Sequence, residues 1–261
     1  MGTRGLIGYY KNRVTKAEYN HFDSYPSELG ETIREYISEN TIHGLNRDFD
    51  SITLISDSDE PSPEQVIAFA NFSYHDVDKV NFSEWYWLVH DCQGDLGAYA
   101  EMGVMLDNID FIKDSLFCEW AYIINLDRNV LEIYKGFQTK RPAANRYSLS
   151  RGEIAALKAK LKGRGRGHYM KNVTTGERTY YKNHVYYNCA LIAQIPLEDV
   201  GNFDMTAFQD AVYAVEGRTD DSVGTMLQPE DFVPGAYRTM MQHRILSITG
   251  LCRVSMGAGE D

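Results

Sequence analysis

The segment Cys118-Glu-Trp-Ala-Tyr-Ile-Ile-Asn-Leu-Asp-Arg-Asn-Val-Leu-Glu-Ile-Tyr-Lys135 decides the fold class, because it is the clearest β-hairpin in the sequence. Two runs rich in β-branched and aromatic residues flank Asp127-Arg-Asn129, which supplies the turn. Alternation along the first run places four apolar side chains on one strand face: Trp120, Tyr122, Ile124 and Leu126. The segment therefore predicts two antiparallel strands with one face turned to a core.

Two further stretches extend this sheet. Residues 5–19 predict an N-terminal hairpin, in which Lys11-Asn12-Arg13 forms the short loop between two strands. Residues 186–195 predict a long strand that Pro196 ends. The nearly continuous apolar run of this last strand is typical of a central position in a sheet.

Segments with helical periodicity separate the strands, and the spacing predicts helices over residues 29–37, 64–72, 83–102, 150–163, 206–216 and 237–248. Ser150 and Glu153 form a capping box at the start of one of them, which Gly163 is expected to close. Hairpins with helices between them indicate an α+β fold, in which helices pack on an antiparallel sheet built from hairpins. We expect residues 1–261 to form a single α+β domain with an exposed basic loop or projecting ribbon at 163–182 and a poorly defined tail at 218–261.

Composition narrows the function classes. The chain has 261 residues, a formal net charge of −11 and a pI near 5.1. This charge argues against general nucleic-acid binding, which depends on cationic side chains that neutralise phosphates. The sequence has no apolar run long enough to span a membrane and no signal-peptide core at its start. Four widely spaced cysteines, at 92, 118, 189 and 252, are expected to be reduced and mostly buried, which favours a cytoplasmic protein.

The candidate site lies in the stretch from Glu18 to Gly30, which we expect to turn from a strand into a helix. A structural turn, in which polar side chains bond the local backbone, is one interpretation of this stretch. A rim of polar groups that binds a ligand is the other. On the second interpretation, Arg4 would lie one strand away and clamp an anionic group. The predicted ligand-binding residues are Thr3, Arg4, Ser24, Tyr25 and Gln93.

The alternative hypothesis is that the protein is an enzyme. Three histidines have an acid close by, in the pairs His21 with Asp23, His75 with Asp76 and His90 with Asp91. In a hydrolase or transferase, His21 would be the general base and Asp23 would orient it. The spacing of these pairs is not that of a metal-binding motif, so we predict neither a metal site nor a cofactor. The starting hairpin resembles that of N-terminal-nucleophile hydrolases in topology, although removal of Met1 leaves Gly2, which has no nucleophile.

A basic and aromatic patch stands out in this acidic chain. It runs from Gly163 to Lys182 and contains Gly-Arg-Gly-Arg-Gly-His-Tyr-Met over residues 163–170. Such a patch can follow a nucleic-acid backbone, and a solvated flexible loop is the simpler interpretation. Contact with nucleic acid through residues 163–182 is therefore a second alternative function.

The N-terminal motifs resemble those of a group of uncharacterised proteins found largely in bacteriophage and bacterial genomes. The residues that carry the resemblance are Met1-Gly-Thr-Arg-Gly5, the turn Tyr19-Asn-His-Phe-Asp-Ser-Tyr-Pro-Ser27 and Leu29-Gly30, with fainter similarity at 93–96 and 117–122. The resemblance implies a phage accessory protein in the cytosol of a host cell, with no known activity. From this resemblance and the polar turn, we expect a protein that binds a small polar or anionic ligand or a host protein. The sequence does not predict its oligomeric state.

Overall fold

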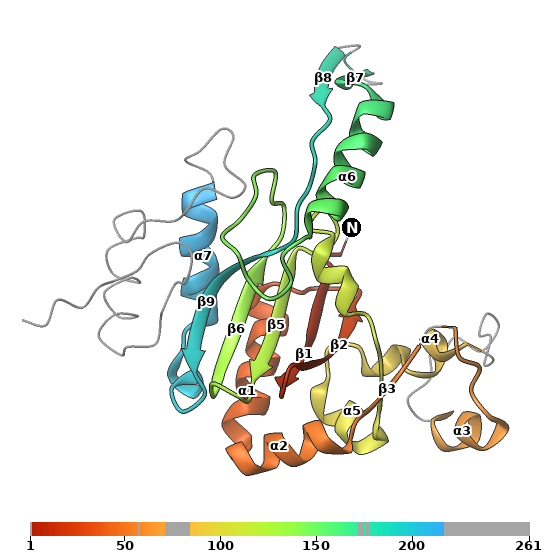
Figure 1. Cartoon of the computed structure of the whole chain (residues 1–261). Coiled ribbons are helices and arrows are strands. Elements are labelled where there is room, and N and C mark those ends of the chain that lie inside the picture. The colour runs from red at the N-terminus through yellow and green to blue at the C-terminus, as the bar shows by residue number, and fades with distance from the viewer. Residues whose placement is uncertain (1, 57, 71–83, 172–174, 176–177, 217–261) are drawn as a thin grey trace, which may run out of the picture.

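The computed structural model describes residues 2–56, 58–70, 84–171, 175 and 178–216. Its main sheet has the strand order β2-β1-β5-β6-β9. The five strands are β1 (Gly5–Lys11), β2 (Val14–Asn20), β5 (Trp120–Asn125), β6 (Val130–Lys135) and β9 (Ala190–Pro196). Helices pack on this sheet, so the predicted α+β fold class is confirmed (Figure 1).

Both predicted hairpins are present, but the sheet that they build is mixed. The pairs β1–β2, β5–β6 and β6–β9 are antiparallel. The hairpins join through β1 and β5, which run parallel from Gly5 opposite Trp120 to Tyr10 opposite Asn125. A hairpin turn cannot connect parallel neighbours. The long chain segment between β2 and β5 therefore makes this connection.

The predicted central position of the strand at 186–195 is wrong. The corresponding strand, β9, starts at Ala190 and lies at an edge of the five-stranded sheet, beside β6. It is apolar because both of its faces are covered: Ile192 packs in one core and Leu191 against the other. Burial on two faces, and not a central position, explains its composition.

The larger core lies between one face of the sheet and a layer of helices. This layer consists of η1 (Pro26–Gly30), α1 (Glu31–Glu39), α2 (Ile42–Ser51), α5 (Leu96–Met102) and α7 (Met205–Glu216). The four apolar side chains predicted to share a face of β5 all lie in this core. The opposite face carries a smaller core with Leu6, Ala121, Ile123 and Tyr134, which Ile112 of η4 (Ile109–Lys113) covers.

A buried polar cluster accompanies the smaller core. The Glu132 carboxylate is fully buried and accepts hydrogen bonds from Asn125 at 2.8 Å, Tyr134 at 2.8 Å and Gln194 at 3.2 Å. Arg146 donates to it at 2.7 Å and stacks on Tyr10, with its guanidinium carbon 3.6 Å from the ring centroid. Because a buried carboxylate is costly without donors, this set of partners holds the loop that bears Arg146 against the sheet.

The helix predicted over residues 83–102 is broken into α4 (Trp85–Leu88), η3 (His90–Cys92) and α5. Gly94 has a φ of +89°, which a helix cannot continue through, and the Asp95 side chain then caps α5 by accepting from the Ala98 amide at 3.0 Å. The apolar side chains of this segment are nevertheless buried in the larger core, namely Trp85, Leu88, Val89, Cys92 and Leu96. The other short elements between β2 and β5 are β3 (Thr53–Ile55), α3 (Pro63–Ala68) and β4 (Val104–Leu106). The short helix η5 (Val200–Asn202) lies between β9 and α7.

Beyond one end of the sheet projects a unit that we call the arm, made of α6 (Arg151–Arg164), β7 (Gly167–Lys171) and β8 (Arg178–Lys182) (Figure 1). The predicted capping box of Ser150 and Glu153 is present. The helix runs past Gly163 and stops before Gly165, whose φ is +79°, so the predicted end was too early. No residue of α6 is buried.

Some expectations fall outside the described residues, namely those for His75, Cys252, the helix at 237–248 and the tail at 218–261. The cysteines that are described, at 92, 118 and 189, are free and buried, as predicted. Among the helices that the structure describes, none combines the length and the apolar content needed to cross a membrane.

Candidate functional site

The turn after β2 packs directly against the first residues of the chain. Thr3 and Ser24 are both buried, and the Ser24 amide donates to the Thr3 carbonyl at 3.0 Å. The Ser24 hydroxyl accepts from the Asn20 side-chain amide at 2.8 Å, and its carbonyl accepts from the Tyr122 hydroxyl at 3.0 Å. These two predicted ligand-binding residues therefore fix the turn to the sheet, which is the structural interpretation of the stretch.

His21 lies at the surface side of the same turn, half-buried. Its Nδ1 is 2.7 Å from the Tyr19 hydroxyl, and its backbone amide donates to Gln93 Oε1 at 3.2 Å. Burial, followed by electrostatic interactions with Arg4 and His90, lowers the pKa of His21. The Gln93 Nε2 atom is buried and has no hydrogen-bond partner in the described part of the chain. The structure thus brings three of the candidate residues, His21, Gln93 and Arg4, close together.

Asp23 and Tyr25 do not complete a catalytic arrangement with His21. Asp23 is exposed with a φ of +48°, and its carbonyl accepts from the Leu29 amide at 3.2 Å. Within the described residues, no hydrogen bond joins the His21 imidazole to the Asp23 carboxylate. The Tyr25 carbonyl accepts from the Glu28 and Gly30 amides of η1, both at 3.1 Å. The general-base hypothesis for His21 and Asp23 stays a prediction.

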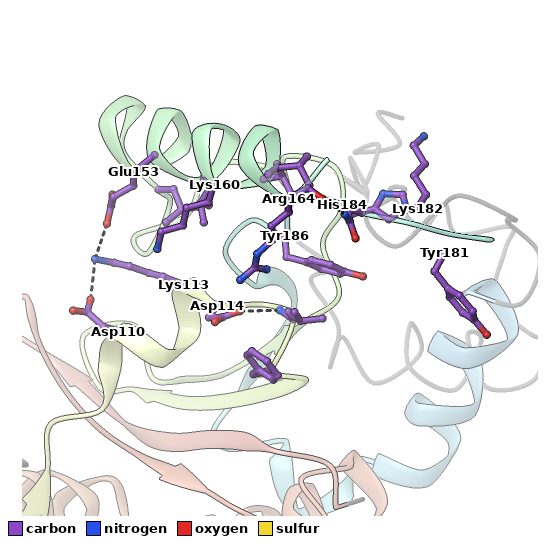
Figure 2. Close-up of a pocket in the computed structure, with 18 of the residues that line it drawn as sticks. Asp110, Lys113, Asp114, Glu153, Lys160, Arg164, Tyr181, Lys182, His184 and Tyr186 are labelled. Atoms are coloured by element: carbon purple, nitrogen blue, oxygen red, sulfur yellow. Dashed lines mark hydrogen bonds and ion pairs between the residues drawn. The ribbon is translucent and has the colours of Figure 1, made fainter. Parts of the chain in front are cut away.

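A cavity of about 690 Å³ lies beneath α6 (Figure 2). One wall is α6, and η4 with the loop to residue 117 forms the opposite wall. The chain from β8 to Tyr186 closes it. The apolar lining includes Leu116, Phe117, Leu149, Leu157, Leu161 and Tyr186, and the basic lining includes Lys113, Lys160, Arg164, His168, Lys182 and His184.

Lys113 bridges the two walls of the cavity. Its Nζ lies 2.8 Å from Asp110 and 3.3 Å from Glu153, the second on α6 (Figure 2). The hydrogen bond to Asp110 leads the causes that raise the pKa of Lys113. Hydrogen bonds from Ser150, and then Lys113, lower the pKa of Glu153 to about 2. Two carboxylates therefore neutralise Lys113, which acts as a clamp between η4 and α6.

The other cations of the cavity are not neutralised in this way. Lys160, Arg164 and Lys182 form no ion pair with any described residue. Asn183 holds the end of α6 to the end of β8, since its side-chain amide donates to the Gly165 carbonyl at 3.2 Å and its backbone amide donates to the Arg166 carbonyl at 3.0 Å. The cavity is therefore a formed recess with an excess of positive charge on the α6 side.

Phe117 connects the predicted site with the cavity. The Arg4 guanidinium carbon lies 5.0 Å from the centroid of the Phe117 ring, and Phe117 lines the cavity. Sequence reasoning missed this recess, because its lining comes from segments that are distant in the sequence. The basic and aromatic composition of residues 163–182 was the signal that pointed to it.

A second recess, of about 650 Å³, lies beside Tyr19 and has the opposite character. It is lined by Tyr19, Tyr86 and Phe111 together with the carboxylates Glu84, Asp107 and Asp110. Its acidic lining disfavours an anionic ligand. Within the described residues, no group of three or more histidine, cysteine, aspartate or glutamate side chains is placed to hold a metal ion.

Comparisons with models of protein families, with curated proteins and with solved structures found no match to this chain.

Proposed function

We propose that this chain is a binding protein whose cavity beneath α6 holds a small anionic ligand with a flat or apolar portion. The observation that carries the proposal is the pairing of an apolar lining with two cations of α6, Lys160 and Arg164, that lack an ion pair among the described residues. A cavity of about 690 Å³ also has the size typical of small-molecule sites.

The residues that line the cavity indicate which of them would contact each part of the ligand. Phe117, Leu157 and Tyr186 would cover the apolar part of the ligand and exclude water from it. Lys160 and Arg164, one helical turn apart on α6, would contact the anionic group. Arg4 supports the site indirectly, because its guanidinium lies against Phe117. The resemblance of residues 1–30 to phage proteins supports an accessory role in the cytosol of a host cell.

Calorimetric titration with 1-naphthyl phosphate, which joins a flat ring system to one phosphate, tests this function. Lys160→Ala should weaken binding by about tenfold, the effect of one lost charge-assisted hydrogen bond. Lys158→Ala is the matched control, since Lys158 is an exposed lysine of the same helix that does not line the cavity. Equal losses in the two variants, or no binding by the unmodified protein, would count against the cavity as the site.

A further inference from the structure

The arm concentrates positive charge in an acidic protein. Residues 151–182 contain nine lysines and arginines and two glutamates, a net charge of +7 in a chain whose total is −11. The rest of the chain consequently carries −18. Segregation of this size creates a local positive potential that overall acidity does not cancel, because charges farther apart than about 10 Å are largely screened at physiological salt.

The β7–β8 ribbon has two different faces. His168 pairs with Tyr181 and Tyr169 pairs with Tyr180, and successive pairs on a ribbon point to opposite sides. His168 and Tyr181 line the cavity, so Tyr169 and Tyr180 lie on the face turned away from it. We call this second face the outer face of the ribbon.

Exposed aromatic rings and a cation share the outer face. Tyr169 is 65% exposed and Tyr180 is 47% exposed, and their ring centroids are 5.0 Å apart. Arg178 precedes Tyr180 by two residues on the exposed strand β8, and its guanidinium carbon lies 5.9 Å from the centroid of the Tyr169 ring. One positive charge therefore lies over one of the paired rings, that of Tyr169.

Gly167 adds to this arrangement. A Cβ atom at Gly167 would overlap both the Tyr180 hydroxyl and the Tyr181 carbonyl, so only glycine lets the Tyr180 ring lie across the partner strand. The two rings, whose planes are tilted by 56° to each other, are therefore held in a defined arrangement and are not isolated exposed side chains.

We propose that the outer face of the β7–β8 ribbon binds single-stranded nucleic acid, with bases on Tyr169 and Tyr180 and a phosphate on Arg178. Stacking platforms within a positively charged surface are the usual means of binding single strands without sequence preference. An acidic polypeptide would satisfy the cations of the arm but would leave the two rings exposed, so the paired rings favour a nucleic acid. This surface uses residues other than those that carry the proposed cavity ligand.

Fluorescence anisotropy of a labelled twelve-nucleotide oligothymidylate, titrated with the full chain at rising salt, tests the proposal. We expect binding that weakens with salt. Tyr180→Ala should weaken it by about tenfold, in line with the loss of one stacked base, while Tyr180→Phe should retain it. Arg178→Ala should reduce the slope of log affinity against log salt by about 0.7, the value for one phosphate of a single strand. Arg128→Ala, an exposed arginine in the β5–β6 turn, should leave the slope unchanged.

Three outcomes would overturn the proposal: no binding at 50 mM salt, equal affinity for a duplex of the same length, or equally effective competition by polyglutamate of the same charge. Phe117→Ala separates this surface from the cavity. It should weaken the binding of 1-naphthyl phosphate and leave the affinity for the oligonucleotide unchanged. Because β7 and β8 pair only with each other within the described chain, the ribbon variants should keep the thermal unfolding midpoint of the unmodified protein.

Discussion

The Tyr19 hydroxyl lies 2.7 Å from Nδ1 of His21, and this contact holds the imidazole beside the start of the chain. Burial, Arg4 and His90 all disfavour the imidazolium, so the pKa of His21 lies below its ordinary value of 6.5. The unfolded chain therefore takes up this proton first as the pH falls. The His21 contribution to stability is complete above pH 6.5 and declines below it, until His21 is protonated in the folded state as well.

Removal of the Arg4 charge should change the pKa of His21 measurably. Arg4→Ala should raise the pKa of His21 toward 6.5, because the guanidinium no longer repels the imidazolium. An NMR titration of the histidine ring protons measures this shift, and Arg13→Ala, at the far end of the first hairpin, serves as the control. An unchanged His21 pKa in Arg4→Ala would show that the two residues are not electrostatically coupled.

The capping box of α6 predicts a second pH dependence. Hydrogen bonds from Ser150 and the ion pair with Lys113 lower the pKa of Glu153 from 4.5 to about 2. Stabilisation by this carboxylate is complete above pH 4.5 and is lost as the pH falls toward 2. Glu153→Gln should make the first amides of α6 exchange hydrogen faster at pH 6. It should also remove the loss of protection of these amides between pH 4.5 and pH 2. Glu39→Gln, the control, should have neither effect. Equal exchange in the two variants at pH 6 would contradict the clamp.

Separation of Arg146 from Glu132 should be strongly destabilising. Arg146→Met should lower the free energy of unfolding by about 3 kcal/mol or more, because the fully buried Glu132 carboxylate loses its only arginine partner among the described residues. Addition of Glu132→Gln should recover part of this loss, since no buried charge then remains. Urea unfolding of the single and double variants measures both effects. A double variant that is less stable than Arg146→Met would refute this explanation.

Two glycines should respond to the same substitution with opposite signs. A Cβ at Gly8 would overlap the Lys16 carbonyl, so Gly8→Ala should force β1 and β2 apart and cost about 3 kcal/mol or prevent folding. Gly163 lies within α6, and no heavy atom lies within 4 Å of the position that a Cβ would take there. Gly163→Ala should therefore favour the helix by up to about 1 kcal/mol. Thermal unfolding compares them, and destabilisation by Gly163→Ala would contradict the exposed position of this helix.

The hairpins were predictable because their signals are local. Alternating apolar residues on either side of Asp127-Arg-Asn129 specify both strands and their register without any distant partner. The parallel pairing of β1 with β5 has no such signal, because its two strands are separated by a long intervening chain. The helix α2 was missed although Thr41 caps it and Leu45 and Phe49 form its buried face. Only these few apolar residues mark it within a mainly polar stretch.

Some features of the candidate site were likewise predictable from the sequence, and others were not. The approach of Arg4 to His21 was predictable, since a hairpin returns the end of its second strand to the start of its first. The roles of Ser24 and Thr3 were not predictable. The same polar residue in a turn can form hydrogen bonds with the local backbone or with a ligand, and the sequence does not distinguish the two. The cavity combines Phe117 with α6, which are distant in the chain, so only tertiary structure shows it.

The parallel pairing of β1 with β5 also bears on how the protein is made. Gly5 meets Trp120, so on the ribosome the first hairpin emerges with one edge of β1 unpaired until more than a hundred further residues have been synthesised. An unpaired strand edge is a template for pairing with another chain. Nascent chains that stop short of Trp120 should therefore depend on chaperones to stay apart from one another, whereas chains that have passed Asn125 can bury that edge themselves.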